Sequence, residues 1–88
     1  MLGAFPNPSR GATRFGFTLD RPGGVHLGVY DAAGRRVAAL PSMDLPSGRH
    51  ESMWTGHDDA GQPAAPGSYF VVLESGGFRN VARFVVTR

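Results

Sequence analysis

The sequence predicts an all-β fold, a small antiparallel sandwich of about seven strands with almost no helix. Three observations support this prediction. The 88 residues include 13 Gly and 7 Pro, which leave little room for a long helix. Several segments alternate apolar and polar residues with the period of a strand. Turn signals recur about every 8 to 12 residues, the spacing of a β-sandwich.

Residues 1–5, with the short apolar segment 2–5, are a possible N-terminal strand or linker. The segment stops at Pro6-Asn7-Pro8, where the prolines remove hydrogen-bond donors from the backbone. This pattern favours an edge strand or a strand that switches sheets. Residues 13–19 then alternate, with Phe15, Phe17 and Leu19 on the apolar face. They are predicted to form a half-buried strand.

The middle of the chain is predicted to contain a hairpin and an edge strand. Residues 25–30 alternate, and Asp31-Ala32-Ala33-Gly34 has the composition of a type I turn. Residues 35–40 form the returning strand. After a polar connection at 41–48, residues 49–54 are less hydrophobic, so we expect them near a sheet edge.

The stretch from Trp54 to Phe70 is predicted to be a hairpin connection. Its Asp58-Asp59-Ala60-Gly61 segment is a turn sequence, and Trp54 and Tyr69 are expected to anchor the flanking strands in the core. Residues 69–73 are apolar on both faces, which indicates a central strand. Residues 74–77 are a hairpin loop before the last strand, 78–86.

Composition limits the size and class of the protein. Residues 1–88 are enough for a single domain. The sequence has no Cys and therefore no disulfide or thiolate metal site. The formal charge is only +2, and the basic residues, all Arg, are spread along the chain, unlike those of a nucleic-acid-binding protein. No apolar run reaches the roughly 20 residues of a transmembrane helix. Residues 1–10 do not resemble a signal peptide.

No pattern of catalytic or cofactor-binding residues stands out, so we predict neither an enzyme nor a cofactor. His26, His50 and His57 lack metal-ligand spacing. Asp58 and Asp59 are interpreted as turn residues, with weak calcium binding as the alternative. Exposed aromatic residues are a further candidate, because they could form a patch for carbohydrate or protein. These residues are Tyr30, Phe70 and Phe78.

Five motifs occur in a recognisable order: P-N-P-S-R-G at 6–11, V-Y-D-A-A-G-R-R-V at 29–37, S-G-R-H at 47–50, D-D-A-G-Q-P-A-A-P-G-S-Y at 58–69 and R-F-V-V-T-R at 83–88. Nearly the whole chain thereby resembles two overlapping Ig-like families of secreted bacterial proteins. One is the C-terminal sorting domain (type A) of type IX secretion. The other is the Ig-like domain of the flagellar hook-capping protein, toward which the W-x-G-x-D-D-x-G loop leans. The resemblance implies an Ig-like β-sandwich.

The sorting-domain resemblance implies a non-enzymatic C-terminal sorting or anchoring module. Such a module passes through the periplasm to the cell surface or the medium, and its partners are outer-membrane secretion or attachment proteins. Its recognition signal would be the terminal strand, here Arg83, Phe84, Val85, Val86 and Arg88. The resemblance also gives family-motif or structural roles to Pro6, Asn7, Pro8, Ser9, Gly11, Tyr30, Asp31, Gly34, Trp54, Asp59, Gly61, Gly67 and Tyr69.

Two other functions fit the same sequence. The domain could be a structural Ig-like module, or a self-assembling subunit of a surface or hook-cap-like assembly in which strand edges or residues 2–5 pair with another copy. It could also be a sugar-binding appendage that uses the exposed aromatic residues. The sequence leaves these alternatives open.

Overall fold

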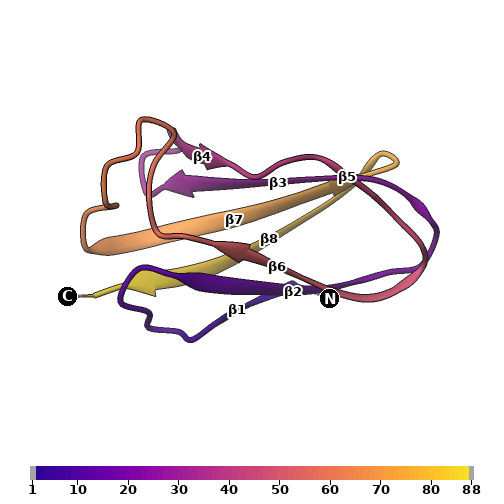
Figure 1. Cartoon of the computed structure of the whole chain (residues 1–88), viewed down its shortest axis with the longest axis horizontal. Helices are drawn as coiled ribbons and strands as arrows, with labels where there is room; N and C mark the ends of the chain where they lie inside the picture. Colours follow the sequence, from indigo (N-terminus) through magenta and orange to yellow (C-terminus); the bar gives the residue numbers. More distant parts are fainter. Residues whose placement is uncertain (1, 88) are drawn as a thin grey trace.

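The computed structural model describes residues 2–87, and these residues form strands and no helix. The all-β prediction is confirmed. No segment of 2–87 is a helix long and apolar enough to cross a membrane. The strands, labelled in Figure 1, are β1 (Leu2–Phe5), β2 (Thr13–Leu19), β3 (Gly23–Asp31), β4 (Arg36–Ala39), β5 (Met43–Leu45), β6 (Gly48–Trp54), β7 (Gly67–Ser75) and β8 (Phe78–Val86).

The strands form two antiparallel sheets that pack as a sandwich (Figure 1). The smaller sheet has the order β1-β2-β6. The larger has the order β4-β3-β7-β8, and β5 pairs with the first residues of β3. The expected edge position of β6 and central position of β7 are confirmed. A sandwich of this kind buries one face of each sheet and leaves the other face to solvent.

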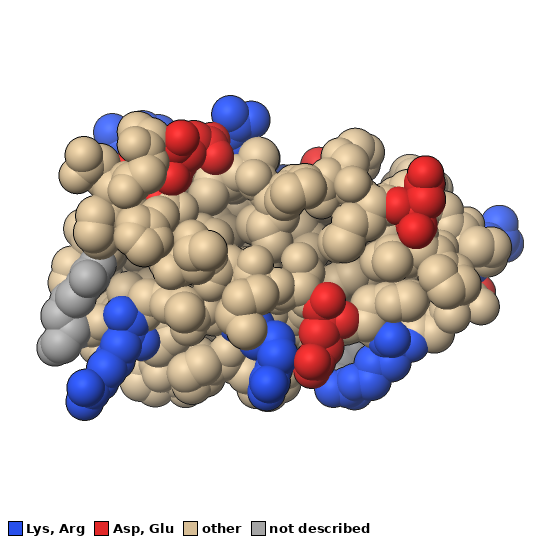
Figure 2. Space-filling view, viewed as in Figure 1, with Lys and Arg blue, Asp and Glu red and all other residues tan. Residues whose placement is uncertain are grey.

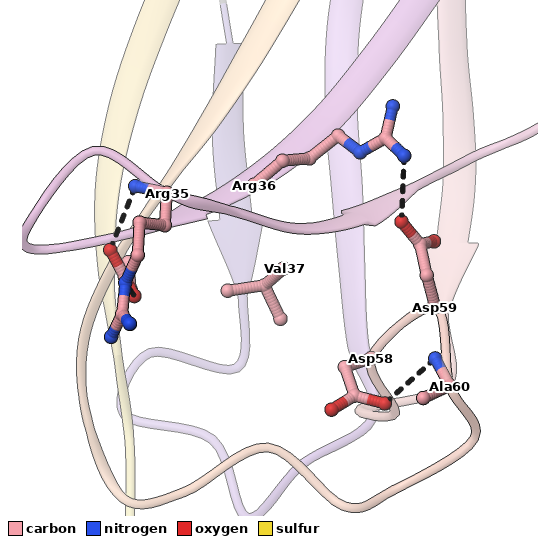
Figure 3. A pocket seen from close by; sticks show the side chains of 7 residues that line it. Arg35, Arg36, Val37, Asp58, Asp59 and Ala60 are labelled. Atoms are coloured by element: carbon pink, nitrogen blue, oxygen red, sulfur yellow. Dashed lines mark hydrogen bonds and ion pairs between the residues drawn. The ribbon is translucent and has the colours of Figure 1, made fainter.

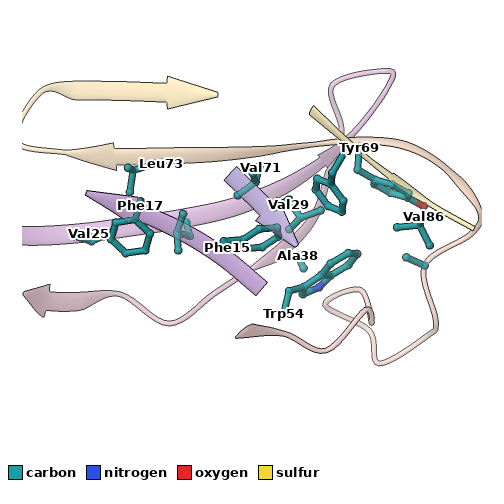
Figure 4. Packing of buried hydrophobic residues seen from close by; sticks show 14 of the residues in the cluster. Phe15, Phe17, Val25, Val29, Ala38, Trp54, Tyr69, Val71, Leu73 and Val86 are labelled. Carbon is teal, nitrogen blue, oxygen red and sulfur yellow. The ribbon is translucent and has the colours of Figure 1, made fainter. Parts of the chain in front are cut away.

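The core follows the alternation that is visible in the sequence. Phe15 and Phe17 of β2 are at most 2% exposed and face the larger sheet. Val29 and Leu73 of the larger sheet are 0% exposed and belong to the same core cluster. Figure 4 shows these side chains between the two sheets. Burial of large apolar side chains contributes about 1.5 to 3 kcal/mol each before the entropic cost of ordering.

Trp54 closes one end of this core (Figure 4). Its ring stacks on Phe15 at a centroid distance of 6.4 Å and meets Phe84 edge-on at 5.8 Å. Its indole N–H donates to the carbonyl of His57 at 3.0 Å, so the one polar atom of the ring is satisfied. Trp54 therefore contacts both sheets and the loop that follows it.

Two details of the predicted elements are wrong. The connection at 41–48 contains an eighth strand, β5, which exists because Met43–Leu45 pairs with Gly23–Val25. The expected four-residue loop at 74–77 is only Gly76-Gly77, both with positive φ (+55° and +80°). A two-residue turn of this kind lets Ser75 pair directly with Phe78 and extends both strands.

The prediction that residues 54–70 form a hairpin connection is also wrong. This segment leaves β6 in the smaller sheet and enters β7 in the larger one. The turn at Asp58 closes within the loop itself, where the N–H of Asp58 bonds the carbonyl of Gln62 at 2.8 Å and His57 bridges to Pro63. Local turn chemistry is therefore present, but it joins two arms of the loop rather than β6 to β7.

Residues 6–12 leave the smaller sheet after β1, touch the larger sheet at Ser9 and return to β2 in the smaller sheet. The Pro-Asn-Pro pattern predicted an edge strand or a strand that switches sheets, and β1 lies at the edge of its sheet. β1 pairs with β2 in the smaller sheet, whereas Ser9 forms a parallel bridge with Val86 in the larger one. The end of β8 consequently lies beside the β1–β2 connection (Figure 1). This corner joins the β1–β2 connection to the C-terminal end of β8.

Candidate functional site

The last strand, β8, is the element to which the sorting-domain resemblance assigns recognition, and the structure divides its residues by burial. Phe84 and Val86 are 0% and 1% exposed and belong to the core. Arg83 is exposed and Val85 is half-buried on the opposite side of the strand. Arg88 lies outside the described residues. A partner can therefore contact Arg83 and Val85, while Phe84 and Val86 hold the strand in place.

The C-terminal half of the β8 edge is already occupied. The N–H of Ser9 donates to the carbonyl of Val85 at 2.8 Å, and the N–H of Thr87 donates to the carbonyl of Ser9 at 2.7 Å. Asn7 completes the contact, because its Oδ1 accepts a hydrogen bond from the N–H of Val85 at 3.0 Å. The Pro-Asn-Pro-Ser segment thus takes the place of a neighbouring strand.

The Ser9 side chain is held in place by a small cluster of buried polar groups. Its hydroxyl accepts from the Thr13 hydroxyl at 2.9 Å and from the N–H of Gly11 at 3.2 Å. Ser9 and Thr13 are 1% and 0% exposed, and buried polar groups of this kind are stable only when they are hydrogen-bonded. Thr13 was not among the residues selected from the sequence, because a single Thr at the start of a strand has no distinctive pattern.

At the other edge of the larger sheet, the β6–β7 loop protects β4 in a similar way. The N–H of Asp59 donates to the carbonyl of Val37 at 2.9 Å, and Asp59 Oδ1 accepts from the N–H of Ala39 at 3.0 Å. Asp59 Oδ2 also lies 3.1 Å from the Arg36 guanidinium. A single acidic side chain therefore covers the edge of β4, which blocks pairing with another strand.

An open hollow of about 520 Å³ lies between this loop and the β3–β4 turn (Figure 3). Asp31, Asp58 and Asp59 line it together with Arg35 and Arg36. Asp31 Oδ2 lies 3.1 Å from Arg35, and Asp31 Oδ1 accepts from the N–H groups of Ala33 and Arg35 at 3.0 and 2.9 Å. The N–H of Arg35, more than its charge, holds the pKa of the Asp31 carboxyl below its ordinary value.

Asp58 also has a structural role in this hollow. Its Oδ1 accepts hydrogen bonds from the N–H groups of Ala60 and Gln62 at 3.0 and 2.9 Å, the arrangement of an Asx turn. Within residues 2–87, no group of three or more His, Cys, Asp or Glu side chains is placed to hold a metal ion. Asp58 therefore acts as a turn residue, as predicted, whereas the Asp59 side chain bonds β4 instead of the turn.

The three aromatic residues expected on the surface do not form one patch. Tyr30 lies directly opposite Phe70 on neighbouring strands of the larger sheet. Phe78 pairs with Ser75, five residues further along β7, which is about 17 Å away at the rise of a strand. The Tyr30 ring folds over Gly28, where an added Cβ would lie 3.0 Å from it. Only Tyr30 and Phe70 therefore share a surface.

The histidines have separate partners. His26 Nδ1 lies 2.8 Å from the Ser42 hydroxyl, and His50 Nε2 lies 2.8 Å from the carbonyl of Pro46. His57 contributes its backbone carbonyl to Trp54. The Ser42–His26 pair is exposed on the surface, without the enclosed, oriented arrangement that nucleophilic catalysis requires.

Comparison with known families identifies the fold that carries these features. The profile of the FlgD Ig-like domain matches residues 6–77, from the Pro-Asn-Pro segment to the β7–β8 turn. The chain belongs to the FlgD Ig-like domain family. The Ig-like family suggested by the sequence is thereby confirmed. None of the proteins with a curated function matches the sequence.

Solved structures share the fold of this FlgD Ig-like domain. Dimeric latent PorU from Porphyromonas gingivalis matches 98% of this chain with a TM-score of 0.75 and 22% identity. PorZ, described as an essential bacterial surface component of the type IX secretion system of the same organism, matches 99% with a TM-score of 0.66 and 21% identity. FlgD from Xanthomonas campestris, a protein of hook capping, matches 96% with a TM-score of 0.63 and 22% identity.

The chain spans only part of each of these proteins. It covers 9% of the PorU chain, 11% of the PorZ chain and 62% of the FlgD chain. The same fold thus occurs within proteins connected with type IX secretion and with the flagellar hook. At this level of identity, the likeness describes the architecture.

Proposed function

We propose that residues 1–88 are one non-enzymatic domain that sorts or anchors an exported bacterial protein, with the type IX secretion machinery as its partner. The observation that carries the proposal is the fold likeness to PorZ, a surface component of that system, over 99% of this chain. On this proposal the protein crosses the periplasm and ends at the cell surface or in the medium. The family motifs named above build the scaffold, and β8 is the recognised element.

The contacts of the charged residues support a scaffold rather than an enzyme. Asp31, Asp58 and Asp59 each bond backbone N–H groups, and two of them also pair with Arg. Figure 2 shows side chains of both signs scattered around the margins of this face, without a large region of one sign. Such a surface suits a protein partner and does not suit a nucleic acid.

The test is export of a reporter fused in front of the domain, in a bacterium that has the type IX system. Removing residues 83–88 is unsuitable, because it would take Phe84 and Val86 out of the core. Arg83→Glu changes an exposed side chain and leaves the core intact. We expect this substitution to reduce export while the melting temperature stays near that of the parent.

Arg21→Glu is the matched control, because Arg21 is exposed in the β2–β3 turn, outside β8. It changes the net charge by the same amount and should leave export unchanged. Equal export of the parent fusion and of the reporter without the domain would contradict the sorting role.

The second candidate is a structural module or self-assembling subunit, as in a hook-cap-like assembly. Family membership and the fold likeness to FlgD favour it. The smaller sheet also ends in β1 and β6, which in residues 2–87 pair only with β2. Unpaired strand edges are surfaces on which another copy can add. Sedimentation over a concentration series tests this function, and a monomer at all concentrations would contradict it.

A further inference from the structure

The outer edge of β8 presents backbone groups that β7 does not use. The N–H and C=O of Val85 both bond the β1–β2 connection, so they point away from β7. In an antiparallel ladder this direction alternates from residue to residue. The backbone groups of Arg79, Val81 and Arg83 therefore point outward as well.

This edge has two halves that differ in how they are protected. At Val85–Thr87, Asn7 and Ser9 occupy the edge from a segment held by two prolines and a buried hydroxyl cluster. At Arg79–Arg83, β1 packs beside β8, but no strand within residues 2–87 pairs with the outward backbone groups. The N–H of Val81 donates to Asn80 Oδ1 at 3.0 Å, a side chain of the adjacent residue. A side chain can rotate away from such a bond without disturbing the ladder to β7.

The side chains along the open half form a simple pattern. Arg79, Val81 and Arg83 lie on the solvent-facing side of the larger sheet, because the alternate residues Ala82 and Phe84 pack in the core. Val81 is 47% exposed, and both arginines are exposed. Across β7, Arg83 is opposite Phe70 and Val81 is opposite Val72. Arg79 is opposite Glu74, and the Arg83 guanidinium donates to Ser68 Oγ at 3.2 Å. The edge thus presents cation, apolar group and cation in register with backbone groups that no neighbouring strand uses.

We propose that the β8 edge from Arg79 to Arg83 binds an extended segment of a protein partner, with acidic, apolar and acidic residues at alternate positions. This inference deepens the proposed function, since β8 is the strand that the secretion partner is proposed to recognise. The added strand bonds the free backbone groups, its two carboxylates lie opposite Arg79 and Arg83, and its apolar side chain contacts Val81. In the free domain, Asn80 Oδ1 accepts the hydrogen bond of the Val81 N–H. A backbone carbonyl of the partner takes over this bond when the strand adds.

Binding is tested with the purified domain and an end-capped synthetic peptide, Thr-Glu-Thr-Val-Thr-Glu-Thr. Hydrogen exchange followed by NMR gives the position of the added strand. At a peptide concentration ten times Kd, the outward amides of Arg79, Val81 and Arg83 should exchange about tenfold more slowly. The exchange rates of the Asn80 and Ala82 amides should not change, because these amides bond β7. Exchange that is unchanged at all three outward amides would overturn the proposal.

A charge exchange tests the role of the two arginines. The double substitution Arg79→Glu with Arg83→Glu should weaken binding of the Glu peptide by about tenfold or more. It should strengthen binding of the same peptide with Lys in place of both Glu. The double substitution Arg10→Glu with Arg21→Glu makes the same charge change at exposed sites outside β8 and should affect neither peptide. Equal effects of the two double substitutions would overturn the charge pairing.

Asn80→Ala tests the local protection of Val81. Because it removes the competing acceptor for the Val81 N–H, it should bind the Glu peptide more tightly than the parent. Weaker binding would contradict this role of Asn80. These measurements need no secretion system, so a domain that binds the peptide but is not exported would contradict only the sorting role. A domain that is exported but does not bind the peptide would contradict only the proposal for the β8 edge.

Discussion

At the scale of single residues, Gly56 is the glycine with the least space for a side chain. It lies where the β6–β7 loop crosses the backbone of Gly11, and an added Cβ would be 2.6 Å from the Gly11 carbonyl carbon. Its φ of +89° is also in the left-handed region that favours glycine. The backbone of Gly11 cannot rotate aside as a side chain could.

Gly56→Ala should therefore lower the free energy of unfolding by about 2 to 4 kcal/mol, as the sum of backbone strain and overpacking. Gly61→Ala is the control, because Gly61 has a similar φ of +84° but no atom within 4 Å of the added Cβ. It should cost only about 1 to 2 kcal/mol, from the backbone term. Urea denaturation of both variants measures the difference. Equal losses would show that the contact with Gly11 is not decisive.

Asp31 should make stability depend on acid. Its pKa is lowered in the folded protein, mainly by the N–H of Arg35. A carboxyl with a lowered pKa stabilises the fold above its unfolded pKa, and this contribution disappears as the pH falls through the folded pKa. The melting temperature of the parent should therefore fall more steeply below about pH 4 than that of Asp31→Asn. Parallel melting curves over pH 2 to 6 would contradict this role.

At the scale of elements, the two edge strands of the larger sheet, β4 and β8, are protected by segments distant in sequence. Asp59 covers β4, and Asn7 with Ser9 covers half of β8. Both segments supply side-chain oxygens and backbone groups in place of a further strand. Edge protection of this kind limits uncontrolled pairing between copies.

Asp59→Asn and Asp59→Ala separate the two contributions of Asp59. Asparagine keeps an acceptor for the Ala39 N–H and loses the exposed ion pair with Arg36, so it should cost at most about 1 kcal/mol. Alanine removes the acceptor too and should cost roughly 1 kcal/mol more. It should also speed hydrogen exchange at the Ala39 amide. If Asn and Ala behave alike in exchange, the side chain of Asp59 does not cover the edge.

At the scale of the whole molecule, Trp54 joins both sheets and the loop between them. Trp54→Ala should cost about 3 to 5 kcal/mol, because it leaves a cavity against Phe15 and Phe84 and removes the bond to His57. Met53→Ala is the matched control, since Met53 is the neighbouring residue of β6 and is 62% exposed. It should change stability by less than about 0.5 kcal/mol. A Trp54→Ala variant that melts like the parent would contradict this core assignment.

The sequence predicted what depends on local pattern. Alternation at Phe15, Phe17 and Leu19 identified β2 and its buried face, and the β3–β4 turn followed from Asp31 and Gly34. β5 was missed because three residues carry no periodic signal, and only pairing with Gly23–Val25 makes them a strand. The sheet change after Trp54 was missed because its turn residues look the same in a hairpin and in a crossing loop.

The candidate site was predictable only in part for the same reason. The sequence pointed to the last strand and to the Pro-Asn-Pro-Ser segment separately. Their contact joins residues 78 positions apart, and no local pattern encodes such a pairing. Consequently, the division of the β8 edge into a closed and an open half appears only in three dimensions.

The bonds between Asn7, Ser9, Val85 and Thr87 also determine how the molecule carries mechanical load. Because Ser9 and Val86 lie in parallel, pulling the two ends of the chain apart slides these segments past each other and strains their hydrogen bonds together. The tension passes directly between these two segments and bypasses the aromatic core until the hydrogen bonds between them break. A domain with this geometry resists stretching at the corner where residues 7–9 bond residues 85–87.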